Sequence, residues 1–336
     1  MTPRWSRPRA GVVSAWLFTL LAGCSSPESG AGRLERTESE ATAVRAIAPS
    51  EGSIAVPGGN VWYRVVGEGD GVPLLLLHGG PGAGSRGFEP FEALGADRPV
   101  VFYDQLGAGR SEKPSDTSLW TIERHIAEID AVRDALGLDE VHILGHSWGS
   151  MLLIEYLLTD PAGVRSATFA SPLFSTARWL ADAKRRVTEL PQELQDVIEV
   201  HETAGTTDSP EYMGAVTAFY QRYLLRTDPW PPLMTQTMEE FGYEVYAYMW
   251  GPSEFTATGT LETWDRMDAL PGLGLPTLFT VGEFDETFPE TVADYASRVP
   301  GARFEEIPAA AHMTMLDAPE ANVRIMQEFL RNVEGR

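Results

Sequence analysis

The chain contains a single cysteine, Cys24, among its 336 residues. One thiol cannot form an internal disulfide bond, so the fold must be stabilised by a hydrophobic core rather than by covalent cross-links. Positive charge is also scarce, because 26 Lys and Arg residues stand against 48 Asp and Glu residues, for a formal net charge of −22. Binding to phosphate groups needs clustered Lys and Arg, so we expect no nucleic-acid partner.

Hydrophobic runs long enough for an ordinary membrane helix are missing too. The apolar run at residues 11–22 is too short to span a bilayer, follows three arginines, and ends in Leu-Ala-Gly-Cys24. Small residues directly before a cysteine resemble a bacterial lipoprotein signal, in which lipid is attached to the thiol. We therefore expect residues 1–23 to be a signal peptide and Cys24 to anchor the protein on the extracytoplasmic side of the cell envelope, at the outer membrane in a Gram-negative organism. The alternative is an ordinary secretory signal with an incidental cysteine.

Two kinds of ligand site are also absent from the sequence. The His residues and the lone Cys do not cluster as metal ligands do, and no glycine-rich segment ends in the Gly-Lys-Ser or Gly-Lys-Thr of a phosphate-binding loop. We expect the protein to need neither a metal ion nor another cofactor.

Short apolar runs that predict strands alternate with segments of helical spacing. The run at residues 73–77 is continuously apolar, which is typical of a central parallel strand buried on both faces. The predicted strands are 61–66, 73–77, 99–103, 141–144, 166–170, 277–281 and 303–307, and the predicted helices are 121–136, 150–158 and 320–331. This order predicts an α/β fold with a mostly parallel sheet and helices on both faces.

Residues 172–270 break this pattern. They are rich in aromatic residues, mostly helical in character, and interrupted by three prolines between residues 229 and 232. We expect them to form a helical cap inserted between two parts of the core, residues 51–171 and 271–336. Residues 24–50 consist largely of Ser, Glu, Ala and Gly with little apolar content, and they predict a flexible tether.

A candidate nucleophile lies in Gly145-His-Ser147-Trp-Gly149, which matches the pattern G-x-S-x-G. The pattern alone is common, but here it directly follows a predicted strand and opens a helix, which is the context of the nucleophile elbow in α/β hydrolases. Glycines are needed beside the serine because the turn is tight. A serine hydroxyl is a weak nucleophile and needs a base.

The chain order selects the other members of a catalytic triad by elimination. In α/β hydrolases the order is Ser, acid, His. Of six histidines only His201 and His312 follow Ser147, and only His312 follows a returning strand. The acid should follow the preceding strand, where three carboxylates compete between residues 283 and 286. The common form G-x-x-D selects Asp285, which would orient the His312 ring.

An acyl transfer also needs hydrogen-bond donors for the developing oxyanion. We expect the backbone N–H of Trp148, the residue after the nucleophile, to supply one. The other should come from the loop His78-Gly-Gly-Pro-Gly82, where Gly80 is the first candidate and Gly79 the near alternative.

Three motifs together resemble the proline iminopeptidase family of serine peptidases. They are His78-Gly-Gly-Pro-Gly82, Asp104-Gln-Leu-Gly-Ala-Gly-Arg-Ser111 and Gly145-His-Ser-Trp-Gly149, and the resemblance extends over the whole predicted folded part. It implies an α/β-hydrolase fold and the release of an N-terminal residue, often proline, from peptides. Some relatives accept other residues or hydrolyse amino-acid amides.

The resemblance also implies an amine-binding site in the cap. Family members carry a G-x-x-E-F segment whose glutamate meets the free α-amino group of the substrate, and Gly251-Pro-Ser-Glu254-Phe255 matches it. A second glutamate usually comes from the G-E-x-D loop, here Glu283. Two such carboxylates would hold the ammonium so that only the first peptide bond reaches Ser147. The alternative is that Glu254 is an exposed cap residue and Glu283 an ordinary loop acceptor. Tyr246 is a further candidate substrate contact.

These observations predict a serine aminopeptidase that acts on peptides or amino-acid amides with a free α-amino group. An amino-acid amidase or a carboxylic esterase with the same triad is the nearest alternative. A non-catalytic envelope lipoprotein that binds peptides is an alternative of another class. The sequence leaves the preferred first residue and the oligomeric state open.

Overall fold

A computed structural model of the chain describes residues 47–336. The predicted signal peptide, Cys24 and nearly all of the predicted tether lie outside the described residues. The last residue of that tether is already part of the folded region, because Ser50 begins the first strand.

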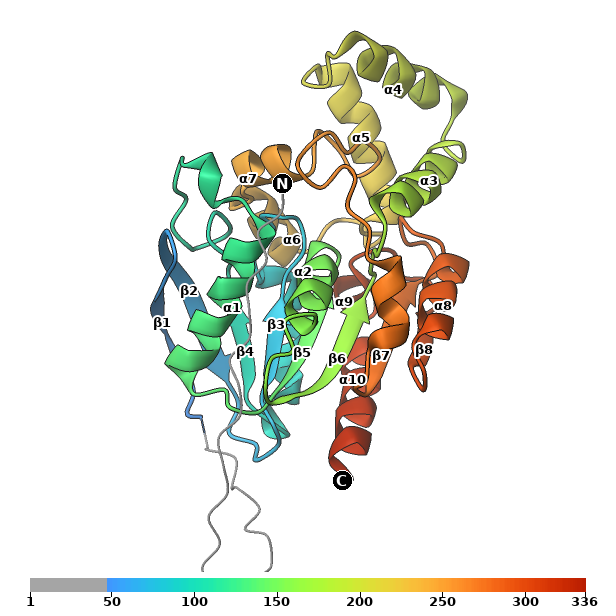
Figure 1. Cartoon of the computed structure of the whole chain (residues 1–336). Coiled ribbons are helices and arrows are strands. Elements are labelled where there is room, and N and C mark those ends of the chain that lie inside the picture. Colours follow the sequence, from blue (N-terminus) through green and yellow to red (C-terminus); the bar gives the residue numbers. More distant parts are fainter. Residues whose placement is uncertain (1–46) are drawn as a thin grey trace, which may run out of the picture. The chain divides into compact units, whose positions relative to one another are not determined.

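Residues 47–336 form one eight-stranded sheet in the order β1-β2-β4-β3-β5-β6-β7-β8 (Figure 1). β2 pairs antiparallel with both β1 and β4, and all the other neighbours are parallel. The strands are β1 (Ser50–Val56), β2 (Gly59–Val66), β3 (Leu74–Leu77), β4 (Val100–Tyr103), β5 (Val141–His146), β6 (Val164–Ala170), β7 (Thr277–Gly282) and β8 (Arg303–Ile307).

Helices cover both faces of this sheet. α1 (Ile122–Leu136), α2 (Trp148–Leu157) and α8 (Pro289–Arg298) pack on one face, and α10 (Pro319–Glu334) and the 3₁₀ helix η1 (Arg86–Ala96) pack on the other. The short segments η2 (Thr117–Leu119), η3 (Met267–Gly272) and α9 (Thr314–Asp317) complete the layers.

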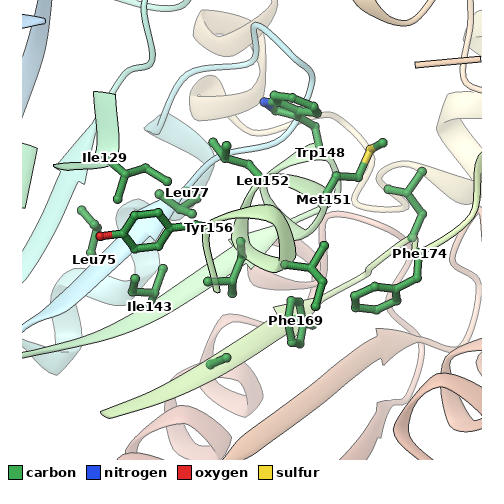
Figure 2. Close-up of a cluster of buried hydrophobic side chains, with 14 of the residues drawn as sticks. Leu75, Leu77, Ile129, Ile143, Trp148, Met151, Leu152, Tyr156, Phe169 and Phe174 are labelled. Atoms are coloured by element: carbon green, nitrogen blue, oxygen red, sulfur yellow. The ribbon is translucent and has the colours of Figure 1, made fainter. Parts of the chain in front are cut away.

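The strand β3 shows why its sequence is continuously apolar. Leu75 and Leu77 point into the core under α1 and α2, which Figure 2 shows together with Ile129, Leu152 and other side chains of that core. Leu74 and Leu76 point into the opposite core, under η1 and α10. Because successive side chains of a strand alternate between faces, burial on both faces leaves no position for a polar residue.

Five further helices lie between β6 and β7 in the chain, in the segment where the sequence predicts a cap. They are α3 (Thr176–Val187), α4 (Gln192–Ala204), α5 (Pro210–Tyr223), α6 (Pro232–Glu239) and α7 (Tyr243–Met249). Figure 1 shows them beyond the carboxyl ends of the parallel strands. Three of these helices share a small apolar core with Phe255, built from Ala183, Leu190, Ile198, Tyr212, Ala215, Val216, Phe219 and Tyr223. Many cap aromatics therefore pack against each other.

The predicted α/β architecture is observed, and its differences from the prediction have physical reasons. The strand β1 was not expected because only Ile54 of its seven residues is buried, so it lacks an apolar run. α8 was not expected either, because it is only ten residues long, from Pro289 to Arg298. The predicted stop of α1 is present, since Gly137 adopts a left-handed conformation with φ of 66° after the last helical residue.

Candidate active site

Ser147 lies at the turn between β5 and α2, and its backbone is strained. Its φ of 54° and ψ of −123° are outside the regions that non-glycine residues normally adopt. The neighbouring glycines are required by close packing. A Cβ atom at Gly145 would lie 2.2 Å from the carbonyl oxygen of Gly149, and one at Gly149 would lie 2.1 Å from that of Leu77. The tight turn therefore fixes the serine at the carboxyl end of the central strand.

Asp285 and His312 come from the loops after β7 and β8 and are directly hydrogen-bonded. The Nδ1 atom of His312 lies 2.8 Å from Oδ1 of Asp285, and both side chains are buried. Burial alone would raise the pKa of Asp285, but the charge and hydrogen bond of His312 outweigh this effect and hold the pKa below its ordinary value. Asp285 is therefore ionised at neutral pH and can orient the imidazole. Ser147 and His312 line the same cavity.

The loop after β3 and the first residue of α2 each place a backbone N–H group next to Ser147. Gly80 has a φ of 117°, and a Cβ atom there would lie 2.4 Å from the backbone nitrogen of Gly82, so only glycine fits. Neither the N–H of Gly80 nor that of Trp148 has an acceptor among residues 47–336. Both residues line a small cavity that also contains Ser147. Two free N–H groups at this position can stabilise a negatively charged oxygen.

Side-chain hydrogen bonds connect the three sequence motifs to one another. The backbone N–H of Gln105 donates to Nε2 of His78 at 2.9 Å, and the Gln105 side chain donates to the His78 carbonyl at 3.0 Å. The Trp148 indole in turn donates to Oε1 of Gln105 at 2.9 Å. One buried glutamine thus fixes the loop that carries Gly80 against the turn that carries Ser147.

Asp104, from the second motif, also stabilises this region. Its carboxylate accepts hydrogen bonds from the backbone and hydroxyl of Ser85 and from the backbone and guanidinium of Arg110. Arg110 also stacks 3.2 Å from the ring centre of Trp62. This motif therefore has a structural role beside the nucleophile rather than a chemical one.

Glu254 lies at the cavity wall and is paired with a tyrosine. The Tyr246 hydroxyl donates to Oε1 of Glu254 at 2.7 Å, and both residues line the cavity that contains Ser147. Burial raises the pKa of Glu254, and the charge of His312 and the Tyr246 hydrogen bond offset only part of the rise. The structure thus brings the two predicted cap residues, Glu254 and Tyr246, into the candidate site.

Glu283 does not join them, which corrects the prediction for this residue. Its side chain is exposed, and Oε2 accepts a hydrogen bond from the backbone N–H of Ala309 at 2.9 Å. The residue that follows Asp285 lies inside instead. Glu286 is completely buried, and one of its oxygens lies 3.9 Å from Nε2 of His312. Sequence reasoning left Glu286 without a role because it compared loop positions and could not see which side chain turns inward.

The Glu286 carboxylate is electrostatically unusual. Neither of its oxygens has a hydrogen-bond partner among the described residues. Burial, followed by the negative charges of Glu254 and Asp285, raises the pKa of Glu286 well above its ordinary value. Two neighbouring carboxylates with few donors around them lack a compensating positive charge.

The space around Ser147 consists of two cavities that share Gly80, Ser147 and Glu254. The larger has a volume of about 290 Å³ and is walled mainly by cap residues, namely Met213, Val216, Tyr220, Leu224, Met234, Met238, Phe241 and Tyr243. The smaller has a volume of about 10 Å³ and is walled by Trp148, Met151, Leu173, Trp179 and Trp250. Within residues 47–336, no three His, Cys, Asp or Glu side chains gather as a metal ion would require.

Comparison with known proteins agrees with this geometry. Residues 72–319 match the family described as the alpha/beta hydrolase fold. The chain is 42% identical over 288 residues to a proline iminopeptidase of Heyndrickxia coagulans, covering 84% of this chain and 99% of that protein. It is 36% identical over 274 residues to a proline iminopeptidase of Clostridium botulinum, covering 80% of this chain and 94% of that protein.

The chain belongs to the proline iminopeptidase family.

Two solved structures superpose on nearly all of the described region. The proline iminopeptidase of Mycobacterium smegmatis gives a TM-score of 0.78 at 33% identity, covering 84% of this chain and 98% of that chain. VinJ gives a TM-score of 0.80 at 35% identity, covering 85% of this chain and 100% of that chain. The predicted α/β-hydrolase fold and the predicted class of enzyme, a hydrolase of the aminopeptidase type, are confirmed.

Membership of the proline iminopeptidase family contradicts the predicted cellular location. The two relatives are matched over 99% and 94% of their own length, so almost nothing of them remains for an anchoring segment. In the part of the chain that the structure describes, no helix is long and apolar enough to cross a membrane. These relatives contradict the predicted location at the cell envelope. The predicted signal peptide at residues 1–23 and the predicted lipid on Cys24 lie outside the described residues.

Proposed function

We propose that the protein is a serine aminopeptidase that releases an N-terminal proline, or another apolar first residue, from peptides through an acyl-enzyme. The curated relatives named proline iminopeptidase support the reaction class. The arrangement of Ser147, Asp285 and His312 supports the catalytic route, and the pair formed by Glu254 at the cavity wall and the buried Glu286 supports the requirement for a free α-amino group.

The triad performs the chemistry in two steps. In the first step the Ser147 hydroxyl attacks the carbonyl carbon of the first residue, and Nε2 of His312 takes its proton. The N–H groups of Gly80 and Trp148 hold the oxyanion. His312 then gives the proton to the leaving amine as the peptide bond breaks. In the second step water attacks the acyl-enzyme, again with His312 as the base, and the free amino acid leaves.

The observation that carries the proposal is the pair formed by Glu254 and Glu286. A serine hydrolase for neutral esters has no use for a buried and a partly buried carboxylate beside its histidine, and their desolvation destabilises the free protein. A substrate ammonium between them would supply the missing positive charge and up to three N–H donors. Tyr246, already hydrogen-bonded to Glu254, would keep that carboxylate in place.

This pair also explains why the enzyme would cleave only the first peptide bond of a peptide. The ammonium and the scissile carbonyl of a first residue are separated by one α-carbon, so fixing the amine beside Glu254 brings only the first carbonyl to Ser147. A peptide bond further along the chain, or one preceded by an acetylated amine, would leave the carboxylates without a cation.

The test compares aminoacyl anilides of Pro, Ala, Leu and Phe, each with a free and an N-acetylated amine. We expect hydrolysis of the free forms and a loss of at least about a thousandfold in kcat/KM for the acetylated forms, since the carboxylates are then desolvated without a partner. Hydrolysis of both forms at similar rates would instead indicate an esterase or amidase that does not recognise the free amine.

Matched variants localise the effect. Glu254→Gln should lower kcat/KM for the free anilides by about a hundredfold or more while hydrolysis of a small ester continues, because the triad is intact. Glu283→Gln is the control: its side chain is exposed and outside the cavity, so its activity should equal that of the wild type. Ser147→Ala should abolish both activities. A Glu254→Gln variant with full aminopeptidase activity would refute the amine site.

A further inference from the structure

The two cavities beside Ser147 differ in size, and this difference determines where each half of a substrate can lie. The following argument rests on the proposed function, in which the amine lies at Glu254 and the scissile carbonyl at Ser147. From that fixed centre, two groups diverge: the side chain of the first residue and the leaving amine with everything attached to it. Both cavities open at this centre, because they share Gly80, Ser147 and Glu254.

The smaller cavity can hold only a compact group. Its volume of about 10 Å³ is close to what one water molecule needs. Its walls include three tryptophans, Trp148 from α2, Trp179 from α3 and Trp250 after α7. A peptide chain that continues beyond the scissile bond does not fit in this space. The continuing chain must therefore enter the larger cavity.

The larger cavity is lined mostly by apolar side chains. Met234 and Phe241 line it inside, and two of the large hydrophobic side chains that the described region exposes, Met213 and Tyr243, lie at its lining as well. Exposed apolar residues that continue a cavity wall mark a binding surface for apolar groups. A bulky apolar leaving group would bury this surface, whereas a glycine amide would not.

The charges around the larger cavity favour a neutral leaving group. The described residues that line it include no Lys or Arg, and Glu254 is the one acidic residue among them. His146, which also lines it, is neutral because burial lowers its pKa to about 3. Arg86, at the start of η1, already pairs with Glu240, and Arg110, on the loop after β4, already pairs with Asp104. A carboxylate one residue beyond the scissile bond would meet no cation and would face Glu254.

We infer that the larger cavity is a leaving-group site selective for neutral, bulky apolar amines, so that the preferred substrates carry an apolar second residue whose own carboxyl group is amidated or extended. A free dipeptide, with its carboxylate inside the cavity, is then a poor substrate even when its first residue fits.

Four substrates with the same first residue test this inference: Pro-Leu-NH₂, Pro-Leu, Pro-Gly-NH₂ and proline anilide. We expect kcat/KM for Pro-Leu-NH₂ to exceed that for Pro-Leu by about tenfold or more because of the unpaired carboxylate. It should exceed that for Pro-Gly-NH₂ by a similar factor because of the buried leucine side chain. Equal values for Pro-Leu and Pro-Leu-NH₂ would overturn the inference. No cleavage of the anilide or of any amide would overturn the proposed function itself.

A gain-of-function variant provides a second measurement on the same substrates. Met238 lines the larger cavity, is only partly buried, and is not part of the triad, the oxyanion donors or the amine site. Met238→Arg should raise the Pro-Leu to Pro-Leu-NH₂ ratio of kcat/KM by about tenfold, because it supplies the missing cation. Met238→Leu, which keeps the wall neutral, should leave that ratio unchanged. An unchanged ratio in a folded Met238→Arg variant would place the leaving group elsewhere and contradict the inference.

Discussion

At the scale of single residues, Glu286 carries the most unusual environment in the described region. It is fully buried, its two oxygens have no hydrogen-bond partner there, and its nearest ionisable neighbours include Glu254 and His312. A buried group of this kind destabilises the fold and is retained where it serves binding or catalysis. Strain of the Ser147 backbone belongs to the same class of feature, since both place reactive groups where substrate is expected.

The elevated pKa of Glu286 makes a prediction for stability. A carboxyl group whose pKa is higher in the folded state than its ordinary 4.5 binds a proton on folding, so the stability of the protein falls as the pH rises above about 4.5. Glu286→Gln removes this penalty. We expect the variant to melt at a higher temperature than the wild type at pH 7 to 8, and the difference to shrink as the pH falls toward 4.5.

The measurement is thermal unfolding of both proteins across this pH range, together with kcat/KM for a free aminoacyl anilide. The activity of Glu286→Gln should fall by about tenfold to a hundredfold while its stability rises, a trade typical of binding sites. Glu283→Gln should change neither quantity. A Glu286→Gln protein less stable than the wild type at pH 8 would show that the carboxylate has a stabilising partner.

At the scale of elements, the helix α3 connects the cap to the loop that holds the acid. Arg186, in its last turn, is buried and donates from Nε to the Asp285 carbonyl at 2.9 Å and from Nη2 to the Glu283 carbonyl at 3.2 Å. Its guanidinium also lies 3.8 Å from the ring centre of Phe288. The carbonyl of Tyr223, at the end of α5, accepts the backbone N–H of His312 at 2.9 Å. The cap thus holds both loops of the triad.

Replacing Arg186 should therefore impair catalysis by displacing the acid loop rather than by removing a contact with the substrate. Arg186→Met is expected to lower kcat by about tenfold to a hundredfold, because small displacements of a catalytic group are costly, and to change KM much less. Arg186→Lys should recover only part of the loss, since one ammonium cannot donate to both carbonyls as the planar guanidinium does.

Arg185→Met is the matched control, because Arg185 is the exposed neighbour on the same helix and pairs with Glu290 at the surface. Steady-state kinetics of the three variants, with circular dichroism to verify folding, measure the effect. An Arg186→Met enzyme with wild-type kcat would show that the acid loop keeps its geometry without the cap.

At the scale of the whole molecule, a buried ionic cluster joins the end of the last helix to the segments just before β3 and β4. Glu334, at the end of α10, accepts hydrogen bonds from Arg98, from the backbone N–H of Val72 and from His142. Arg98 is fully buried and also pairs with Asp97. The hydrogen bonds of His142 and Arg98 outweigh the effect of burial and lower the pKa of Glu334 to about 2.

Glu334→Gln should therefore destabilise the fold by about 2–4 kcal/mol at neutral pH, since it leaves the Arg98 charge buried with one anion fewer. A depressed pKa means that this stabilisation is complete above the ordinary value of 4.5 and is lost as the pH falls through about 2. The difference between variant and wild type in urea unfolding should accordingly be largest at pH 7 and narrow below pH 4.5. Glu328→Gln, at an exposed position on α10, should have little effect. Equal stabilities of Glu334→Gln and the wild type at pH 7 would contradict this account of the cluster.

Much of the site was predictable because its residues occupy positions that local sequence marks. Ser147 lies in a glycine-bounded turn, and His312 is the histidine that follows a returning strand, so chain order was sufficient to choose both. Glu254 and Tyr246 were found through the family resemblance of the cap segment. The wrong choice of Glu283 over Glu286 has a simple reason: adjacent residues in a loop point in different directions, and loop spacing does not say which one turns inward. Arg186 gave no sequence signal, because its partners are backbone carbonyls nearly a hundred residues away.

The sequence by itself determined the α/β architecture and the nucleophile turn, because apolar periodicity and obligatory glycines are local properties of the chain. Only the tertiary structure decided what surrounds Ser147. The burial of Glu286, the division of the substrate space into a compact and a large apolar cavity, and the support of the triad by the cap all arise from contacts between segments far apart in sequence. Such contacts set desolvation and distance, and these two quantities control both charge and access at the site.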